Sequence, residues 1–306
     1  TDAAARAAGY LVAGLVDGNH LTSDFGNESI TADAVLALVA AGRDEDAAAI
    51  DAMVGYLEQQ TPSYATSPEA AAKLVIVALA TGKDPAAFGG TDLVAAVSAG
   101  VQADGSFGSF PGPYASGLGL IALAGTGSEI PAAMTDWLVG RADAGGGWGY
   151  EPGQPADADS TGMAILGLKA LPEPTEAATA AIDAAVAWAG TARQADGSWP
   201  GFAPVNSTAV LGSALQAAGV EQPEAVAYLV GLQQADGGLP TGAEGATGSD
   251  PLATAQGTLL LAGASYLSPA PAAAAAPGWD TTNVVLWGVI AALAVGVGVA
   301  VLARRR

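Results

Sequence analysis

The 306-residue chain contains no cysteine and a single histidine, His20. Without cysteine it forms no disulfide, and it cannot build a zinc site that combines cysteine with histidine and aspartate. An extracellular domain without cysteine is still reasonable, because roughly 265 residues bury a hydrophobic core without covalent cross-links. We therefore expect stability to come from packing, and we expect neither a metal nor a cofactor.

Positive charge is also scarce, with ten lysine and arginine residues against thirty aspartate and glutamate residues. Three of the ten cations are the final residues Arg304, Arg305 and Arg306, and every acidic residue lies at or before Asp280. Residues 1–280 thus carry seven cations against thirty acids, a net charge of −23. Such a surface repels polyanions, so we expect no nucleic-acid partner.

The C-terminal end differs from the rest in hydropathy. Residues 284–303, VVLWGVIAALAVGVGVAVLA, are apolar and uncharged, and they are enough for about 30 Å of helix. We expect a transmembrane helix over 282–303, a Pro- and Ala-rich spacer over 268–281 and a cytoplasmic Arg tail over 304–306. Residues 1–267 then lie on the extracellular face of the cytoplasmic membrane. Because the chain begins at Thr1, we expect that a signal peptide has been removed.

Before residue 268, a unit of about 44 residues repeats six times. The runs of small residues end at Gly42, Gly82, Gly125, Pro172, Gly219 and Gly263, at intervals of 40, 43, 47, 47 and 44 residues. Each unit has an amphipathic segment, a turn rich in Asp, Gly and aromatic residues, and a segment of Ala, Leu, Val and Gly. A repeat of this length indicates stacked helix pairs. The sequence therefore predicts an all-α fold with twelve helices.

The two kinds of segment predict two rings of helices. The amphipathic segments are 2–16, 44–60, 91–101, 130–141, 175–193 and 221–234, and the small-residue segments are 32–41, 69–81, 117–124, 161–170, 208–218 and 253–262. The second set is apolar nearly all round, as expected for an inner ring that is packed inside the first set. None of the six inner segments contains Phe, Tyr or Trp.

Residues able to cap a helix stand just before most inner segments. They are Thr31, Ser67, Ser116, Ser160, Ser207 and either Asp250 or Thr254. A capping side chain accepts a hydrogen bond from a free N–H group of the first helical turn. If all inner helices start at one end of the ring, six partly positive N-termini surround one mouth, where polar groups can bind.

The turns between paired segments share a pattern of Gln-x-Asp-Gly-x-aromatic, with variations. They are QADGSFGSF (102–110), RADAGGGWGY (141–150), QADGSWPGF (194–202) and QQADGGLP (233–240). Such a turn, between an amphipathic and a small-residue helix, resembles the repeat shared by squalene cyclases and protein prenyltransferases. The resemblance spans residues 1–267 and implies an α/α toroid, in which six helix pairs close one ring.

The residue content of the chain decides which enzyme activities of that family are possible. Protein prenyltransferases hold zinc through Asp, Cys and His, and thioester proteins need Cys, so the lack of cysteine excludes both. PADADST (155–161) resembles the Asp-x-Asp-Asp-Thr acid motif of class II triterpene cyclases, which implies Asp159 as proton donor and Asp157 as its first partner. Ser160 replaces the last Asp, and an inner ring without aromatic residues cannot stabilise carbocations, so both observations argue against cyclase chemistry.

A sugar-cleaving enzyme is a further alternative, because it requires two carboxylates that face one cleft. Asp157, Asp159, Glu151 and Asp250 are the candidates. The separation between any two of them is not given by the sequence. We therefore keep a terpene-cyclase-like or polysaccharide-cleaving enzyme that uses Asp157 and Asp159 as the alternative hypothesis.

Our main expectation is a non-catalytic binding module on a membrane anchor. The stretch YLVAGLVDGNHLTSDFG…ITADAVLALVAAG (10–42) is similar to surface-exposed actinobacterial toroid proteins with prenyltransferase-like repeats. More distantly, the chain is similar to the helical domains of transcobalamin and intrinsic factor, which bind a corrinoid with the help of a β-rich domain. These resemblances imply capture of a small molecule such as a corrinoid, or of a partner such as a β-domain surface protein.

The predicted binding surface lies at the mouth formed by the turns and the N-termini of the inner helices. Its residues are Tyr114, Trp148, Tyr150, Asp157, Asp159, Trp199, Phe202, Asn206 and Asp250. Aromatic and polar side chains around a concavity are typical of binding sites. Trp148 and Trp199 have a second interpretation as plugs that cover helix ends, and the polar residues have a second one as helix caps.

Overall fold

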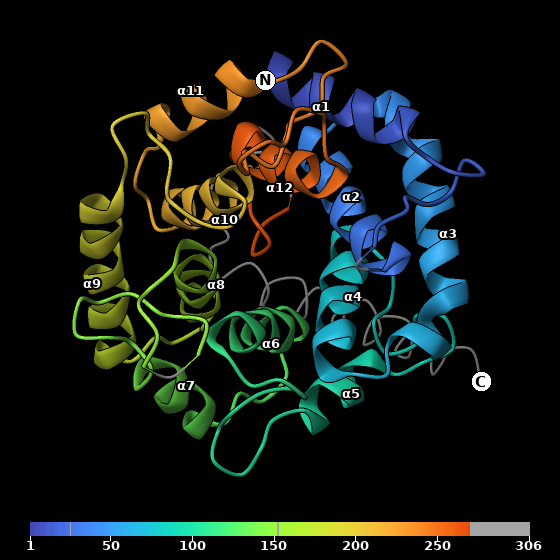
Figure 1. The fold of residues 1–306 in the computed structure, drawn as a ribbon. Coiled ribbons are helices and arrows are strands. Elements are labelled where there is room, and N and C mark those ends of the chain that lie inside the picture. Colours follow the sequence, from blue (N-terminus) through green and yellow to red (C-terminus); the bar gives the residue numbers. More distant parts are fainter. Residues whose placement is uncertain (25, 152, 270–306) are drawn as a thin grey trace, which may run out of the picture. The chain divides into compact units, whose positions relative to one another are not determined.

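The computed structural model describes residues 1–24, 26–151 and 153–269 (Figure 1). The helices in this part are α1 (Asp2–Ala13), α2 (Asn27–Ala41), η1 (Asp44–Asp46), α3 (Ala47–Tyr64), α4 (Pro68–Ala80), α5 (Leu93–Ala99), α6 (Pro113–Thr126), α7 (Ala132–Val139), α8 (Ala158–Lys169), α9 (Glu176–Ala192), α10 (Pro204–Ala217), α11 (Pro223–Leu232) and α12 (Pro251–Ala262). The described residues contain no β-strand beyond isolated bridges. The prediction of an all-α fold with six helix pairs is confirmed for this part of the chain.

The helices form two concentric rings (Figure 1). The even-numbered helices form the inner ring and the odd-numbered helices the outer one. The inner ring closes because α12 packs against α2. At the same seam, Thr1 Oγ1 donates a hydrogen bond of 3.0 Å to the Leu261 carbonyl, and Gln233 Nε2 donates one of 2.9 Å to the Ala3 carbonyl. The described residues therefore form a closed α/α toroid, the fold that the sequence predicted.

The predicted membrane span at 282–303 and the predicted Arg tail lie outside the described residues, as does all but the start of the spacer. Within the described part, none of the helices combines the length and the apolar composition needed to cross a bilayer.

The inner helices pack closely because small residues face their neighbours. In α2, every residue from Ile30 to Leu38 is buried. Between α6 and α8 the backbones nearly touch, since a Cβ atom placed on Gly117 would lie 2.2 Å from the Met163 carbonyl oxygen. Such contacts leave no room for a side chain at that point. The apolar core thus lies around the inner ring, between the two layers of helices.

The threonines near the start of the inner helices anchor the preceding turns. The Thr31, Thr161, Thr208 and Thr254 hydroxyls accept hydrogen bonds of 2.8 to 3.0 Å from the backbone N–H groups of Leu21, Trp148, Trp199 and Leu239, respectively. All four threonines are fully buried. The side chains of the four residues that donate to them are also buried, with only a trace of exposure at Leu21. The repeat therefore uses this position to bind a turn to a helix.

The predicted caps require correction. Ser67 caps α4 and Asp250 caps α12, as expected. Asp157, and not Ser160, caps α8, and no side-chain cap is present at α2, α6 or α10. The helices begin three to five residues earlier than predicted at α2, α6, α8 and α10. At α6 and α10 the first helical residue is proline, whose fixed φ and missing N–H suit that position.

Candidate functional site

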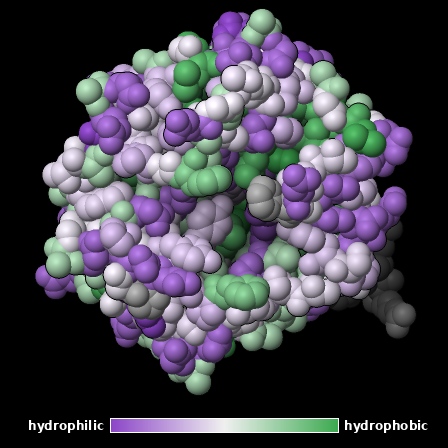
Figure 2. All heavy atoms as spheres, viewed as in Figure 1, coloured by the Kyte–Doolittle hydropathy of each residue, from purple (hydrophilic) through white to green (hydrophobic). Residues whose placement is uncertain are grey.

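Polar side chains from all six inner helices meet inside the ring. They are Asp33 (α2), Lys73 (α4), Tyr114 (α6), Asp159 (α8), Asn206 and Ser207 (α10) and Gln256 (α12), together with Tyr266 from the segment after α12. The groups that act electrostatically on Tyr114 are Lys73, Asp33 and Asp159, which come from three other helices. Such a set can converge only within the ring, and we call it the central cup. Figure 2 shows that this face of the molecule is hollowed at its centre, with hydrophilic and hydrophobic residues around the hollow.

A buried ion pair forms one side of the cup. Lys73 Nζ lies 2.9 Å from Asp33 Oδ2 and donates a further hydrogen bond of 3.1 Å to Ser29 Oγ. Side-chain exposure is 12% for Lys73 and 3% for Asp33. Burial alone would lower the pKa of Lys73, but the Asp33 carboxylate raises it above its ordinary value. Lys73 therefore stays protonated, and its charge is balanced by Asp33.

A chain of hydrogen bonds leads from the ion pair to the other side of the cup. The Tyr266 hydroxyl donates to Asp33 Oδ1 at 3.0 Å, and Gln256 Nε2 donates to the Tyr266 hydroxyl oxygen at 3.4 Å. Asn206 Nδ2 donates to Gln256 Oε1 at 2.9 Å. Asp33, Tyr266, Gln256 and Asn206 are all at least nine-tenths buried. The base of the cup is thus a connected polar network in which most side chains have a hydrogen-bond partner.

Asp159 stands apart from this hydrogen-bonded network. It lies in the first turn of α8, is partly buried, and accepts a 2.7 Å hydrogen bond from Ser207 Oγ at its Oδ2 atom. Burial raises the pKa of Asp159, the Ser207 hydrogen bond lowers it and the charge of Asp157 raises it, and the net shift is upward. A carboxyl group of this kind keeps its proton at higher pH than an exposed Asp, so it can act as a general acid.

Tyrosine rings reach the cup, which corrects the prediction of an inner ring without aromatic residues. Helix α6 begins at Pro113, so Tyr114 belongs to the inner ring. Tyr266 enters from the segment after α12, which Figure 1 shows inside the ring of inner helices. Burial raises the pKa of Tyr114 to about 12, and the pKa of Tyr266 is also raised, by burial first and then by the charge of Asp33. Both rings therefore carry protonated hydroxyls at neutral pH.

Trp148 and Trp199 do not line the mouth, contrary to expectation. Both side chains are fully buried. Trp148 Nε1 donates to the Leu138 carbonyl at the end of α7, and Trp199 Nε1 donates to the Ala189 carbonyl in α9. A fully buried indole that fills the space between the rings cannot meet a ligand at an open mouth. These residues plug helix ends, the second of the two interpretations given by the sequence.

The other predicted residues occupy three kinds of place. Asn206 and Asp159 belong to the cup, as does Tyr114. Asp157 and Asp250 accept backbone hydrogen bonds from Ser160 and Ala253 and cap their helices. Tyr150 and Phe202 are exposed at the turns, with 71% and 97% of their surface accessible.

Sequence reasoning missed Asp33, Lys73, Gln256 and Tyr266. The available signal was a charge within each of two apolar segments: Asp33 in ITADAVLALVAA, and Lys73 in AAAKLVIVALA, beyond the Glu69 of the first helical turn. A lone charge inside a helix that is otherwise apolar requires a buried partner. The two segments belong to neighbouring repeats, so an ion pair between Asp33 and Lys73 was the simplest prediction.

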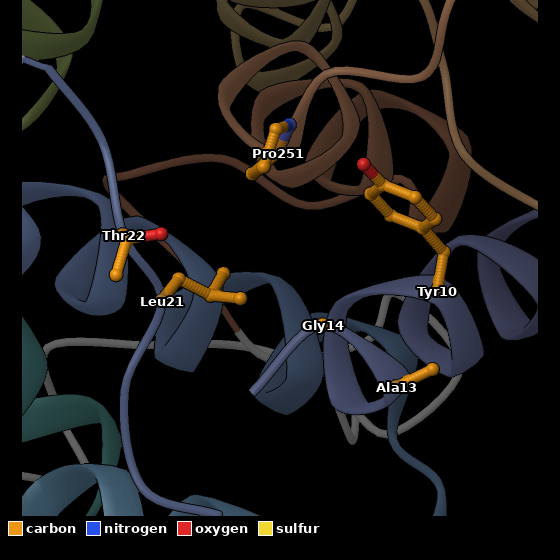
Figure 3. Close-up of a pocket in the computed structure, with 6 residues that line it drawn as sticks. All are labelled: Tyr10, Ala13, Gly14, Leu21, Thr22 and Pro251. Atoms are coloured by element: carbon orange, nitrogen blue, oxygen red, sulfur yellow. The ribbon is translucent and has the colours of Figure 1, made fainter. Parts of the chain in front are cut away.

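Two cavities lie away from the cup. The first, of about 330 Å³, is lined by Tyr10, Ala13, Gly14, Leu21, Thr22 and Pro251. Figure 3 shows the Tyr10 ring extending from α1 towards the start of α12. The second, of about 650 Å³, is lined by turn residues on both sides of Trp148, from Gly140 to Pro155. We consider the cup the stronger candidate site, since the first cavity has no charged lining residue and the second is formed by surface turns.

The sequence matches no protein-family model and no curated protein. Solved structures do match. The type II terpene cyclase MstE from Scytonema superposes with a TM-score of 0.60 at 16% identity, over 78% of this chain and 81% of that one. A variant of MstE in complex with geranylgeranyl dihydroxybenzoate, named as its substrate, gives a TM-score of 0.64 at 15% identity, over 85% and 95%. The chain has the α/α toroid fold of these cyclases.

Two further structures extend the comparison. A protein from Actinoplanes gives a TM-score of 0.61 at 17% identity, over 87% of this chain and 98% of that one. The ent-copalyl diphosphate synthase from Streptomyces platensis gives 0.51 at 22% identity, over 78% of this chain and 50% of that one. The resemblance to a terpene-cyclase-type toroid is thus confirmed at the level of the fold.

The comparisons contradict the expectation of a non-catalytic capture module. The structures with this fold include cyclases determined with a bound substrate and with a bound product. They give no support to a cell-surface role, a corrinoid ligand or a likeness to transcobalamin. The alternative, a terpene-cyclase-like or polysaccharide-cleaving enzyme that uses Asp157 and Asp159, agrees better with these findings.

Proposed function

We propose that the chain is an enzyme that starts the cyclisation of a terpenoid by protonating a carbon–carbon double bond, with Asp159 as the acid. The observation that carries the proposal is the partly buried Asp159 carboxyl group, whose pKa is raised and which shares the cup with Tyr114. The fold shared with type II terpene cyclases supports the same reading. Ser160 stands where the cyclase motif has its last Asp, and the side-chain hydrogen bond to Asp159 comes from Ser207 of α10.

The chemistry follows from the groups in the cup. The Asp159 proton adds to one alkene carbon and leaves a cation on the other, and the next double bond of the chain attacks that cation and carries the positive charge onward. The last cation loses a proton to water, and the Asp159 carboxylate regains a proton from solvent. Ser207 donates to the carboxylate that remains. The rings of Tyr114 and Tyr266 are the kind of side chain that stabilises a carbocation. Since Lys73 is neutralised by Asp33, it adds no unbalanced positive charge to the cup.

The same contacts argue against a sugar-cleaving enzyme. That chemistry needs a second carboxyl group that faces the first across the substrate. Asp157 accepts the Ser160 N–H as a helix cap, and Asp33 is paired with Lys73. Of the carboxyl groups placed in the cup by the described residues, only Asp159 is neither paired with a cation nor used as a cap.

Replacing Asp159 with Asn is expected to lower kcat/KM for cyclisation at least about 100-fold, because the amide has no acidic proton. Turnover is measured by mass spectrometry with squalene, farnesol and geranylgeraniol as substrates. Asp92→Asn is the matched control, since Asp92 caps the outer helix α5 and Asn caps equally well. Cyclised product formed at equal rates by Asp159→Asn and the control would contradict the proposal.

The pH profile provides an independent test. The active form carries a protonated Asp159, so kcat/KM should stay level at low pH and fall as the pH rises through the pKa of Asp159, which lies above the ordinary value of 3.8. Ser207→Ala removes the hydrogen bond that lowers this pKa, so the fall should move to higher pH. A fall that stays in place or moves to lower pH would show that Ser207 does not act on the acid.

A further inference from the structure

Asn206 has an unused hydrogen-bond acceptor inside the cup. It lies in the first turn of α10, and only 8% of its surface is exposed. Its Nδ2 atom donates to Gln256 Oε1, whereas its Oδ1 atom is buried and has no hydrogen-bond partner among the described residues. A buried carbonyl oxygen without a donor costs free energy, so a donor supplied by a ligand is favoured there.

The orientation of the Asn206 amide is fixed by the far end of the network. The Asp33 carboxylate, paired with Lys73, can only accept, so the Tyr266 hydroxyl must donate to it. The Tyr266 oxygen then accepts from the Gln256 NH₂ group, which turns Gln256 Oε1 towards Asn206. Asn206 must therefore donate its NH₂ group to Gln256. The Asn206 Oδ1 acceptor is therefore the end of the network that has no hydrogen bond at all, whereas the Asn206 NH₂ group is already engaged through one of its two N–H bonds.

The cup also has no free cation for an anionic ligand. Its one cation, Lys73, is paired with Asp33. The other lysines and arginines of the described part are used elsewhere: Arg6, Arg43, Lys83 and Arg193 pair with acidic residues, Arg141 lies over the Trp137 ring, and Lys169 ends α8. A diphosphate has acceptor oxygens and negative charge, so it matches neither Asn206 Oδ1 nor the charge of the cup.

We propose, on the basis of the proposed function, that the substrate is a terpenoid with a neutral hydrogen-bond donor, such as a hydroxyl group, which donates to Asn206 Oδ1. Ser207, the next residue, holds Asp159, so the recognised group lies on the acid side of the cup. Substrates with a diphosphate head group are disfavoured by the same arrangement. Asn206 is a specificity-determining residue and takes no part in proton transfer.

The test is the binding of three compounds with the same hydrocarbon chain to the full-length protein, measured by calorimetry. Farnesol has a hydroxyl donor, farnesyl methyl ether has none, and farnesyl diphosphate has only acceptors at its charged head. We expect farnesol to bind at least about tenfold more tightly than the ether, and the diphosphate no more tightly than the ether. Equal binding of farnesol and the ether, or tightest binding of the diphosphate, would overturn the inference.

Two leucine variants locate the effect. Asn206→Leu should bind farnesol and the ether equally, whereas Gln216→Leu should keep the preference of the unmodified protein. Gln216 lies on the same helix, and its Oε1 atom is also buried without a partner, but it is ten residues away, about 15 Å along α10. If Asn206→Leu does not fold, the comparison of farnesol with the ether in the unmodified protein still decides whether the hydroxyl donor contributes to binding.

Turnover separates this inference from the proposed function. If the protein prefers farnesol but forms no cyclised product, the role of Asn206 in recognising a hydroxyl group stands and the proposed cyclase activity is refuted. Cyclisation of farnesol and the ether with equal efficiency would keep the enzyme and refute the role of Asn206. The absence of binding by all three compounds would refute the inference.

Discussion

Replacing Lys73 with methionine is expected to lower the free energy of unfolding by about 3–5 kcal/mol. The variant leaves Asp33, 3% exposed, as a buried carboxylate without its cation, and only the Tyr266 hydroxyl still donates to it. Methionine fills much of the volume of the lysine stem, so the loss reflects charge more than packing. Urea denaturation of the full-length protein, followed by far-UV circular dichroism, measures the change.

Two variants give this prediction its controls. Lys83→Met removes a surface ion pair with Glu58, at 3.8 Å and with both side chains at least a third exposed, and should cost no more than about 1 kcal/mol. The double variant Asp33→Asn/Lys73→Met removes both charges and keeps an oxygen for Tyr266, so it should recover most of the loss. If the double variant is as unstable as Lys73→Met, the unpaired charge is not the cause.

Replacing Gly237 with alanine is expected to cost roughly 3 kcal/mol of stability, from an unfavourable backbone angle and from crowding together. Gly237 has φ of +90°, and a Cβ atom there would lie 2.4 Å from the carbonyl oxygen of Arg6 in α1. Because Gly237 belongs to the last Asp-Gly turn, this contact joins the sixth helix pair to the first. The change is measured as the shift of the urea midpoint.

Gly231→Ala is the matched control for Gly237→Ala. Gly231 lies within α11 and is exposed, and a Cβ atom placed on it would meet no other part of the protein within 4 Å. Gly231 is the penultimate residue of the helix, so alanine there should be neutral or stabilise the protein by no more than about 0.5 kcal/mol, less than in a helix interior. If Gly231→Ala lowers the free energy of unfolding as much as Gly237→Ala does, the close contact between Gly237 and Arg6 is not the cause of the loss.

The number and order of the helices follow from the sequence because each unit repeats the same order of periodicity, turn and small-residue run. The residues at which the inner helices start are predicted less accurately from the sequence. Ser160 and Ser207 were expected to cap their helices, but Asp157 caps α8 and the Ser207 hydroxyl donates to Asp159, a contact that depends on tertiary packing. Prolines such as Pro113 and Pro204 mark the true starts.

The site was predictable only in part. The motif around Asp159 is local, so the sequence alone identifies this residue as a candidate acid. The partners that define its surroundings are distant: Ser207 is 48 residues away, and the Asn206–Gln256 contact spans 50. Shifting the start of α6 by four residues moved Tyr114 from a turn into the inner ring. That small error removed the aromatic side chain on which the judgement about carbocations depended.

The bond between Tyr266 and Asp33 joins residues that are 233 positions apart. During translation, the first helix pair leaves the ribosome long before the segment that supplies Tyr266. Until that segment arrives, Asp33 and the apolar edge of α2 have no partner from the end of the chain, and such exposed surfaces promote aggregation and invite chaperones. A nascent chain that is released early would therefore lack the floor of the cup, however well its completed repeats had folded.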